Sequence, residues 1–259
     1  MTAQLKSTSH GQTMVLTLSN PALRNALTTD ICAAGIEALN VAETNPDIRS
    51  VVITGEGANF CAGSDVQRLH SQIQQGAQAQ AQTLESVHNW MEAIRTCPKP
   101  VVAAVEGACV GAGFSLALVC DLIVAAHDSV FMSGYSNLGL SPYGGASWNL
   151  AQALPRQAAM EVLLLDERLS AERMHSLGLI NRVSDRGQAL GQALTLAERL
   201  NTRAPNAMSS IKELMNEAPD HHLTAHLAAE RQAFVKNLLH PNARSGIEAF
   251  LSKQTPTYK

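Results

Sequence analysis

Two short apolar segments, residues 50–54 and 101–105, constrain the fold of this chain most strongly. The first reads Ser-Val-Val-Ile-Thr and the second Val-Val-Ala-Ala-Val, so apolar side chains occupy consecutive positions in both. A strand with two apolar faces is buried on both sides, as parallel strands covered by helices are. Gly55 and Gly107 follow the two segments. The sequence therefore predicts an α/β fold in which parallel strands lead into glycine-containing turns.

The rest of the chain alternates strand and helix patterns and then becomes mostly helical. We expect a strand over 14–18 and a helix that starts at Thr28–Asp30 and ends near Glu43. The glutamine-rich stretch 67–82 is expected to be a loop or a helix. Further helices are predicted over 88–96, 158–165, 170–176, 188–200, 207–217 and 222–239, with a helix passing into a strand over 116–126 and short strands at 131–133 and 181–183.

Composition excludes several classes of protein. The chain has 259 residues, of which 46% are hydrophobic and 16% charged, which is too apolar for a disordered protein. Nineteen Lys and Arg against 22 Asp and Glu give a net charge of −3, so no global field favours nucleic acid or an anionic membrane. Glu106 and Asp121 interrupt the longest apolar-rich stretch, which argues against a membrane span.

The cysteines and the N-terminal sequence predict a cytoplasmic protein. There are five cysteines, an odd number, and no two have CxxC spacing, which disfavours a disulfide framework or a zinc knuckle. Thiols that stay reduced fit the cytoplasm. Residues 1–20 also lack the apolar core of a signal peptide.

Several common motifs are absent from the sequence. Gly111-Ala-Gly113 is followed by Leu116 where a dinucleotide-binding loop needs its third glycine. There is no P-loop and no HExxH helix. In Gly134–Gly139 the second glycine comes one residue too late for the nucleophile turn of a serine hydrolase. His221, His222 and His226 lack a carboxylate or cysteine partner, so we expect no metal site.

Two glycine-containing turns remain, at 59–65 and 106–113. Their small residues let a ligand approach the backbone, and a helix that follows such a turn exposes free N–H groups. Two such turns at the carboxyl ends of neighbouring strands could hold one carbonyl oxygen between two amides, which is an oxyanion hole. Close packing of helix against sheet would explain the same residues, and the spacing alone leaves both interpretations open.

Eight short motifs in a fixed order resolve this choice. The chain carries Asn20-Pro-Ala-Leu-Arg-Asn-Ala-Leu27, Phe60-Cys-Ala-Gly-Ser-Asp65, Lys99-Pro-Val-Val-Ala-Ala-Val-Glu-Gly107, Gly111-Ala-Gly113, Cys120-Asp-Leu122, Leu138-Gly-Leu-Ser-Pro142, Ala171-Glu-Arg173 leading into Leu177-Gly-Leu179, and Glu248-Ala-Phe-Leu251. Over essentially its whole length the chain resembles the enoyl-CoA hydratase/isomerase, or crotonase, superfamily.

The resemblance implies a fold, a substrate and an assembly. The expected fold is α/β, a crotonase-like spiral of ββα units over 1–195 that binds acyl-CoA. A helical region over 196–259 would form a trimer, or a hexamer built from two trimers, and help to close the site. Coenzyme A would enter as part of the thioester substrate, with no permanently bound cofactor.

The resemblance also assigns roles to individual residues. The backbone N–H groups of Ser64 and Ala112 would be the oxyanion donors. Asp65 is also expected to cap the helix that follows it, and Arg24 is equally consistent with an ordinary surface charge. The residues expected to line the coenzyme A path are Arg24, Ala26, Leu27, Ala62, Asp65, Val66, Phe250 and Lys253, the last two in some relatives from a neighbouring subunit.

The chain departs from the family where acids are expected. The positions of the two hydratase glutamates hold Ser115 and Tyr135, and the position of an acid in other members holds Tyr143. A positioned acid or base contributes roughly 10²–10⁴-fold to a rate. Tyrosine, with an ordinary pKa of about 10, is a plausible proton donor and a poor base. His88 matches a histidine near the acyl pocket of aryl-CoA dehalogenases, although a lone helical histidine is more often a surface residue.

Three functions remain open from the sequence. The primary hypothesis is an enoyl-CoA hydratase/isomerase-like enzyme that stabilises a thioester enolate, with Tyr135 and Tyr143 shaping the pocket or donating a proton. The alternatives are a catalytically silent coenzyme A-binding member, and a thioester hydrolase or other enzyme that acts on aromatic or alicyclic acyl-CoA.

Overall fold

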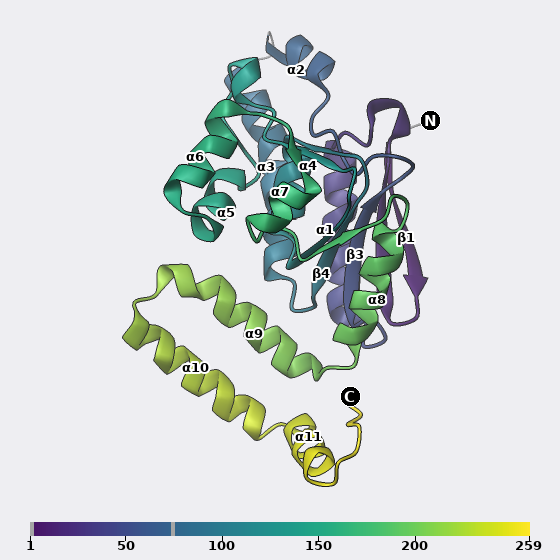
Figure 1. The fold of residues 1–259 in the computed structure, drawn as a ribbon, viewed down its shortest axis with the longest axis vertical. Coiled ribbons are helices and arrows are strands. Elements are labelled where there is room, and N and C mark those ends of the chain that lie inside the picture. Colours follow the sequence, from purple (N-terminus) through teal and green to yellow (C-terminus); the bar gives the residue numbers. More distant parts are fainter. Residues whose placement is uncertain (1–2, 74–75) are drawn as a thin grey trace.

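A six-stranded sheet lies at the centre of the molecule (Figure 1). The computed structural model describes residues 3–73 and 76–259. The first two strands pair antiparallel and every later pair is parallel. In spatial order the strands are β1 (Gln4–His10), β2 (Thr13–Ser19), β3 (Ser50–Gly55), β4 (Val101–Val105), β6 (Leu122–Ala126) and β9 (Arg182–Ser184).

Helices cover both faces of this sheet. On one face, α1 (Thr29–Thr44) packs against β1, β2 and α3 (Ala77–Thr96). On the other, α8 (Ala189–Asn201) packs against β2, β3, β4, β6 and β9. Val51 and Ile53 belong to one hydrophobic cluster and Val52 to the other. This double burial is the reason that β3 is apolar at consecutive positions.

A smaller three-stranded sheet adjoins the first, with the order β5-β7-β8. The elements in this part of the chain are β5 (Ala108–Val110), β7 (Val130–Met132), β8 (Leu169–Ser170), α2 (Val66–Gln72), α4 (Ala112–Val119), α5 (Ala146–Ala153), α6 (Arg156–Leu165) and α7 (Ala171–Ser176). Of these shorter helices, α4 and α7 pack against the smaller sheet.

The expected α/β alternation is confirmed, with shifted boundaries. The helix of 116–126 begins earlier, at Ala112, and the strand expected at 181–183 lies at Arg182–Ser184 on the sheet edge. In the stretch 67–82, α2 and the start of α3 are helical, and residues 74–75 lie outside the described ranges. β1, β5, β8, α5 and α11 were not among the predicted elements.

Three C-terminal helices extend away from the two sheets (Figure 1). They are α9 (Pro205–Glu217), α10 (Leu223–Leu238) and α11 (Pro241–Leu251). No residue of α10 is buried. The large apolar side chains exposed on and beside these helices are Ile211, Met215, Leu223, Leu227, Phe234, Val235, Leu238, Leu239, Ile247, Phe250 and Leu251.

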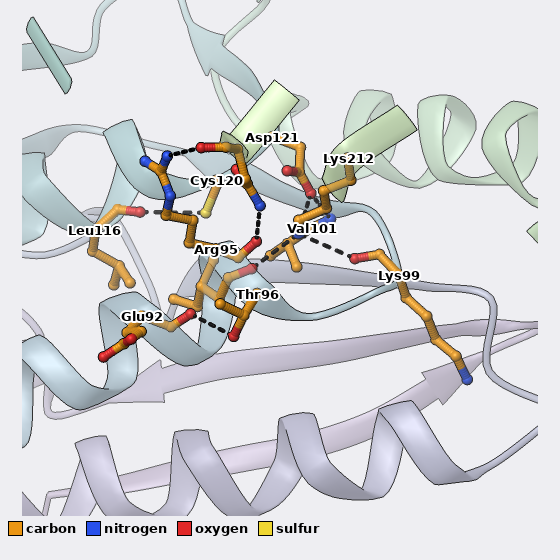
Figure 2. Close-up of polar contacts among 11 residues, drawn as sticks. Glu92, Arg95, Thr96, Lys99, Val101, Leu116, Cys120, Asp121 and Lys212 are labelled. Carbon is orange, nitrogen blue, oxygen red and sulfur yellow. Dashed lines mark hydrogen bonds and ion pairs between the residues drawn. The ribbon is translucent and has the colours of Figure 1, made fainter. Parts of the chain in front are cut away.

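Polar contacts attach α9 to the rest of the molecule (Figure 2). Lys212 Nζ lies 2.8 Å from Asp121 Oδ2, and the two side chains are 10% and 27% exposed. The same carboxylate oxygen accepts a 2.7 Å hydrogen bond from the Val101 N–H, at the start of β4. Arg95 and Asn216 exchange two hydrogen bonds between α3 and α9. The helical extension is therefore fixed to the strand that leads into the second glycine turn.

Within the described ranges, every helix is too short or too polar to span a lipid bilayer.

Removing the Lys212 ammonium should destabilise the protein measurably. Burial raises the pKa of the Asp121 carboxyl and Lys212 opposes that rise, so Lys212→Met leaves a poorly solvated carboxylate without its partner. We expect a loss of about 2 kcal/mol in the free energy of unfolding, below the roughly 3–5 kcal/mol typical of fully buried pairs. Urea denaturation measures this loss. Lys236→Met on α10 is the exposed control, and the double variant with Asp121→Asn should lose less than Lys212→Met alone.

Candidate active site

The two glycine turns are joined by backbone hydrogen bonds. Cys61 and Cys109 form a parallel β-bridge. The Cys61 N–H donates to the Ala108 carbonyl at 3.0 Å, and the Val110 N–H donates to the Cys61 carbonyl at 2.9 Å. The turns follow β3 and β4, which are parallel neighbours, so the sheet already brings their carboxyl ends together. The turn after β3 is thus held against β5.

The approach between the turns leaves no room for side chains at two glycines. A Cβ at Gly63 would lie 2.7 Å from the Val110 carbonyl oxygen and 3.0 Å from the Ala112 nitrogen. A Cβ at Gly113 would lie 2.3 Å from the Cys61 carbonyl oxygen. Gly63 also has a φ of +86°, which favours glycine. The glycines therefore allow the backbone next to Ser64 to reach the first residue of α4.

Both predicted oxyanion amides lie at this contact. Ala112 is the first residue of α4, so its N–H is one of those that a helix cannot satisfy internally. Ser64 lies outside the helices and strands. In the described parts of the chain, its N–H donates to no backbone or side-chain acceptor. Ser64, in the first turn, directly follows Gly63. Ala112, in the second turn, directly precedes Gly113.

Residues 24–27 run alongside the first turn. The Ala62 N–H donates to the Arg24 carbonyl at 3.0 Å, and the Leu27 N–H donates to the Gly63 carbonyl at 2.8 Å. The structure thus brings Arg24, Leu27 and Ala62 together, while the Arg24 side chain is exposed. Ala26 is buried, and Val66 is exposed at the start of α2.

Asn25 holds this segment in place and was missed by the sequence reasoning. It is fully buried with a φ of +60°, and its Nδ2 donates to the carbonyls of Glu56 at 3.0 Å and Asn59 at 2.8 Å. Its Oδ1 accepts from the Asn20 N–H at 3.0 Å. Asparagine tolerates the left-handed region better than most residues, which is the local signal that could have indicated it.

A cavity of about 250 Å³ opens beside the two amides. No acidic residue of the described chain lines it. We name it the turn cavity, and its lining residues are Ala62, Ser64, Val66, Leu69, Val110, Gly111, Ala112, Met132, Gly134, Tyr135, Asn137, Leu138, Leu140 and Tyr143.

The three residues that stand where acids were expected contact one another. The Tyr143 hydroxyl is hydrogen-bonded to Ser64 Oγ. The Tyr143 carbonyl accepts a 2.7 Å hydrogen bond from Ser115 Oγ and a 3.4 Å contact from the Tyr135 hydroxyl. The two tyrosine rings meet edge to face with centroids 5.5 Å apart. Ser115 therefore fixes the backbone of Tyr143, and Tyr143 places its hydroxyl at the first turn.

Burial keeps both phenols protonated. Burial raises the pKa of Tyr135 well above its ordinary value, and the neighbouring Tyr143 adds to the rise. Burial also raises the pKa of Tyr143, against the lowering effect of its hydrogen bond to Ser64. At neutral pH both groups can donate a hydrogen bond and neither is a ready base.

Asp166 shapes the cavity wall that contains Tyr135, and sequence reasoning did not single it out. Its carboxylate accepts hydrogen bonds from the Gly134 N–H and from the Asn137 N–H, the latter at 3.3 Å. The Asn137 side-chain amide donates to the Asp166 carbonyl at 3.2 Å. Asp166 is 2% exposed and has a φ of +52° at the end of α6. No local sequence pattern connects residues so far apart along the chain.

Other predicted residues lie near the cavity or apart from it. Asp65 caps α2 by accepting from the Gln67 N–H at 2.9 Å. His88 is exposed on α3, with its ring centroid 6.3 Å from that of Tyr143. Phe250 is 82% exposed on α11 and Lys253 follows that helix, and neither lines the turn cavity of its own chain.

Two further candidates have structural roles. Burial raises the pKa of the Cys61 thiol to about 12, which makes it a poor nucleophile. The Glu106 carboxylate accepts from the N–H groups of Gly187 at 3.1 Å and Ala189 at 2.9 Å, at the start of α8. Across residues 3–73 and 76–259, no three His, Cys, Asp or Glu side chains gather as a metal site would require.

Comparison with known proteins now identifies the family. The sequence pattern of the enoyl-CoA hydratase/isomerase family matches residues 8–259. The chain belongs to this family. A crystal structure of an enoyl-CoA hydratase from Polaromonas sp. JS666 is 60% identical and matches with a TM-score of 0.98, covering 99% of this chain and 100% of that one.

Relatives in the family carry names for different reactions. The chain is 33% identical over 246 residues to the 1,2-epoxyphenylacetyl-CoA isomerase of Escherichia coli K12, covering 95% of this chain and 94% of that enzyme. It is 32% identical over 247 residues to the 2,3-dehydroadipyl-CoA hydratase of the same strain, with the same coverage. The protein is therefore an enoyl-CoA hydratase/isomerase-like acyl-CoA enzyme with the crotonase fold, which confirms the expected fold class and family.

Titration of the tyrosines tests the burial of the two phenols. We expect Tyr135 and Tyr143 to stay neutral in the folded protein at pH values where a free phenol, with a pKa of about 10, ionises. Because the unfolded chain loses these protons first, stability is full below about pH 10 and falls as the pH rises further. Phenolate absorbance of folded and urea-unfolded protein measures this. Ionisation of Tyr135 and Tyr143 in the folded protein at the pH at which a free phenol ionises would contradict it.

Proposed function

We propose that the thioester carbonyl of an acyl-CoA binds between the backbone N–H groups of Ser64 and Ala112. The observation that carries this proposal is the contact between the two turns, where a Cβ at Gly63 would lie only 2.7 Å from the Val110 carbonyl oxygen and 3.0 Å from the Ala112 nitrogen. Two fixed amides that point at one oxygen stabilise the negative charge of an enolate, and one such donor is worth roughly 10²–10³-fold in rate. Backbone donors do not depend on the side chains of Ser64 and Ala112.

The proposed coenzyme A path follows the segment hydrogen-bonded to the first turn. Arg24, Ala26 and Leu27 would line it, with Ala62, Asp65 and Val66 nearer the adenine. Phe250 and Lys253 would complete it from a neighbouring subunit, because neither residue lines the cavity of its own chain.

A trimer, or a hexamer of two trimers, would cover the apolar side chains exposed on α9, α10 and α11. In this proposal residues 1–195 bind the substrate and 196–259 assemble the oligomer, although α8 crosses that boundary and packs on the sheet. Five free, buried cysteines support a cytoplasmic location. Coenzyme A enters with the substrate, and we propose no resident cofactor.

Tyr143 is the proposed proton donor. Its hydroxyl is hydrogen-bonded to the Ser64 side chain, and the Ser64 N–H would hold the thioester oxygen. The phenol would therefore lie next to the negative charge that develops on that oxygen. Ser115 orients Tyr143 through its carbonyl, and Tyr135 forms the adjoining wall. None of these groups is a base suited to activating water at neutral pH.

Two alternative functions follow from the same residues. A silent coenzyme A-binding protein is favoured by Ser115 and Tyr135 at the positions of both hydratase glutamates. A hydrolase or an enzyme for aromatic or alicyclic acyl groups is favoured by the two tyrosines, with His88 on the neighbouring helix. Release of free coenzyme A, followed with a thiol reagent, would identify hydrolysis.

Acyl-CoA binding tests the proposed oxyanion hole. We expect butyryl-CoA to bind with a Kd below about 1 mM in isothermal titration calorimetry. Gly63→Ala should weaken binding at least about tenfold, because its methyl group collides with the Val110 carbonyl oxygen and so displaces the backbone that leads into Ala112. The matched control is Gly57→Ala, which has a similar φ of +76° but open space around the new methyl group. Equal losses in the two variants would argue against the site.

The rate at which the protein hydrates crotonyl-CoA tests whether the absence of the two glutamates limits catalysis. We expect hydration to be roughly 10²–10⁴-fold slower than in relatives with both glutamates, because the acid and base are absent. Loss of the enoyl-thioester absorbance measures the rate. Tyr143→Phe should lower the remaining turnover. Tyr135→Phe should lower it less, because the Tyr135 hydroxyl makes only a 3.4 Å contact with the Tyr143 carbonyl. A wild-type rate equal to that of glutamate-bearing relatives would refute this account.

A further inference from the structure

The turn cavity has an exposed side and a buried side. Val66, Leu138 and Leu140, which line the exposed side, are each about half exposed. Ala112 and Tyr135, which line the buried side, are almost inaccessible. Coenzyme A is far too large for a space of about 250 Å³, so most of it must remain at the exposed side. An acyl group whose carbonyl lies between the two proposed amides therefore points into the buried side.

Tyr143 belongs to this buried side and is held there by several contacts. Its hydroxyl is hydrogen-bonded to Ser64 Oγ, and its carbonyl accepts the 2.7 Å hydrogen bond from Ser115 Oγ. Its ring meets the Tyr135 ring edge to face. The next residue, Gly144, lies so close to α4 that a Cβ there would be 3.0 Å from the Ser115 Cβ. Both the backbone and the side chain of Tyr143 are thus fixed.

Little room lies on the far side of the Tyr143 ring. The space that it lines there, between α2 and α3, measures about 30 Å³, which is about the volume of one water molecule in the liquid. Tyr143 also packs against the main hydrophobic cluster, which includes Val87 and Met91 of α3. An alkyl chain that reaches the ring therefore meets packed side chains and no onward passage.

We propose that the ring of Tyr143 limits the length of the acyl group, so that the preferred substrates are short-chain acyl-CoA thioesters. This inference rests on the proposed function. It gives the ring a role that is separate from proton donation by the hydroxyl. In an apolar pocket with room to spare, each added methylene strengthens binding roughly fourfold. Against a packed wall, an added methylene instead forces neighbouring side chains out of their preferred rotamers.

The affinities of butyryl-CoA and octanoyl-CoA test the proposal, because these two ligands differ only by four methylenes. In calorimetric titration of the wild-type protein we expect octanoyl-CoA to bind at least about tenfold more weakly than butyryl-CoA. A pocket without a limit would give the opposite order. Tyr143→Ala removes the ring, so the variant should bind octanoyl-CoA at least about tenfold more tightly than the wild type does.

Two control variants separate the ring from the hydroxyl and from the rest of the cavity. Tyr143→Phe removes the hydroxyl and keeps the ring, so it should retain the preference for butyryl-CoA. Leu138→Ala enlarges the cavity at its exposed side and should change both affinities by the same factor. Circular dichroism first establishes that each variant is folded.

The wild-type comparison decides the matter even if a variant fails to fold. Octanoyl-CoA that binds the wild type as tightly as butyryl-CoA would overturn the inference and leave the proposed function standing. A folded Tyr143→Ala variant that keeps the wild-type preference would have the same consequence. If the wild type binds neither ligand, the proposed function itself is refuted.

Discussion

The close contact between two glycine turns is the constraint on which the site depends. Parallel pairing of β3 and β4 brings the turns to the same edge of the sheet, and the Cys61–Cys109 bridge then fixes one against the other. At Gly63 and Gly113 the remaining distance excludes even a methyl group. Two amides from distant parts of the chain are thereby held at one place without any side chain. A site of this kind tolerates changes in nearby side chains more readily than changes in its glycines.

Uncharged polar side chains lie beside this contact. Ser115, Tyr135 and Tyr143 form a connected set in which a carbonyl is fixed and two phenols stay protonated. Asp166 supports the adjoining wall from the end of α6 through bonds to backbone N–H groups. The arrangement can polarise a carbonyl and donate a proton. None of these three side chains is a base suited to activating water at neutral pH, so we propose that binding and hydration are separate in this chain.

The sequence predicted the parts of the fold that depend on local patterns. Consecutive apolar residues in β3 and β4, and the cap at Thr28, which accepts from the Ile31 N–H at 3.2 Å, are visible along a few residues of chain. β1 is a mostly exposed edge strand without apolar alternation, so nothing local indicates it. Asn25 and Asp166 act on backbone groups distant in the sequence, and such bonds exist only after the sheet has formed. The family resemblance placed Ser64 and Ala112, whereas spacing alone left close packing as an equal explanation.

The infrared stretching frequency of a bound thioester carbonyl tests the central claim most directly. Butyryl-CoA labelled with ¹³C at the carbonyl would be compared free and bound to the full-length protein by difference spectroscopy. Two amides that donate to the oxygen weaken the carbonyl bond, so the account predicts a shift to lower frequency that Gly63→Ala diminishes and Gly57→Ala retains. A bound thioester whose carbonyl frequency equals that in water would contradict the account.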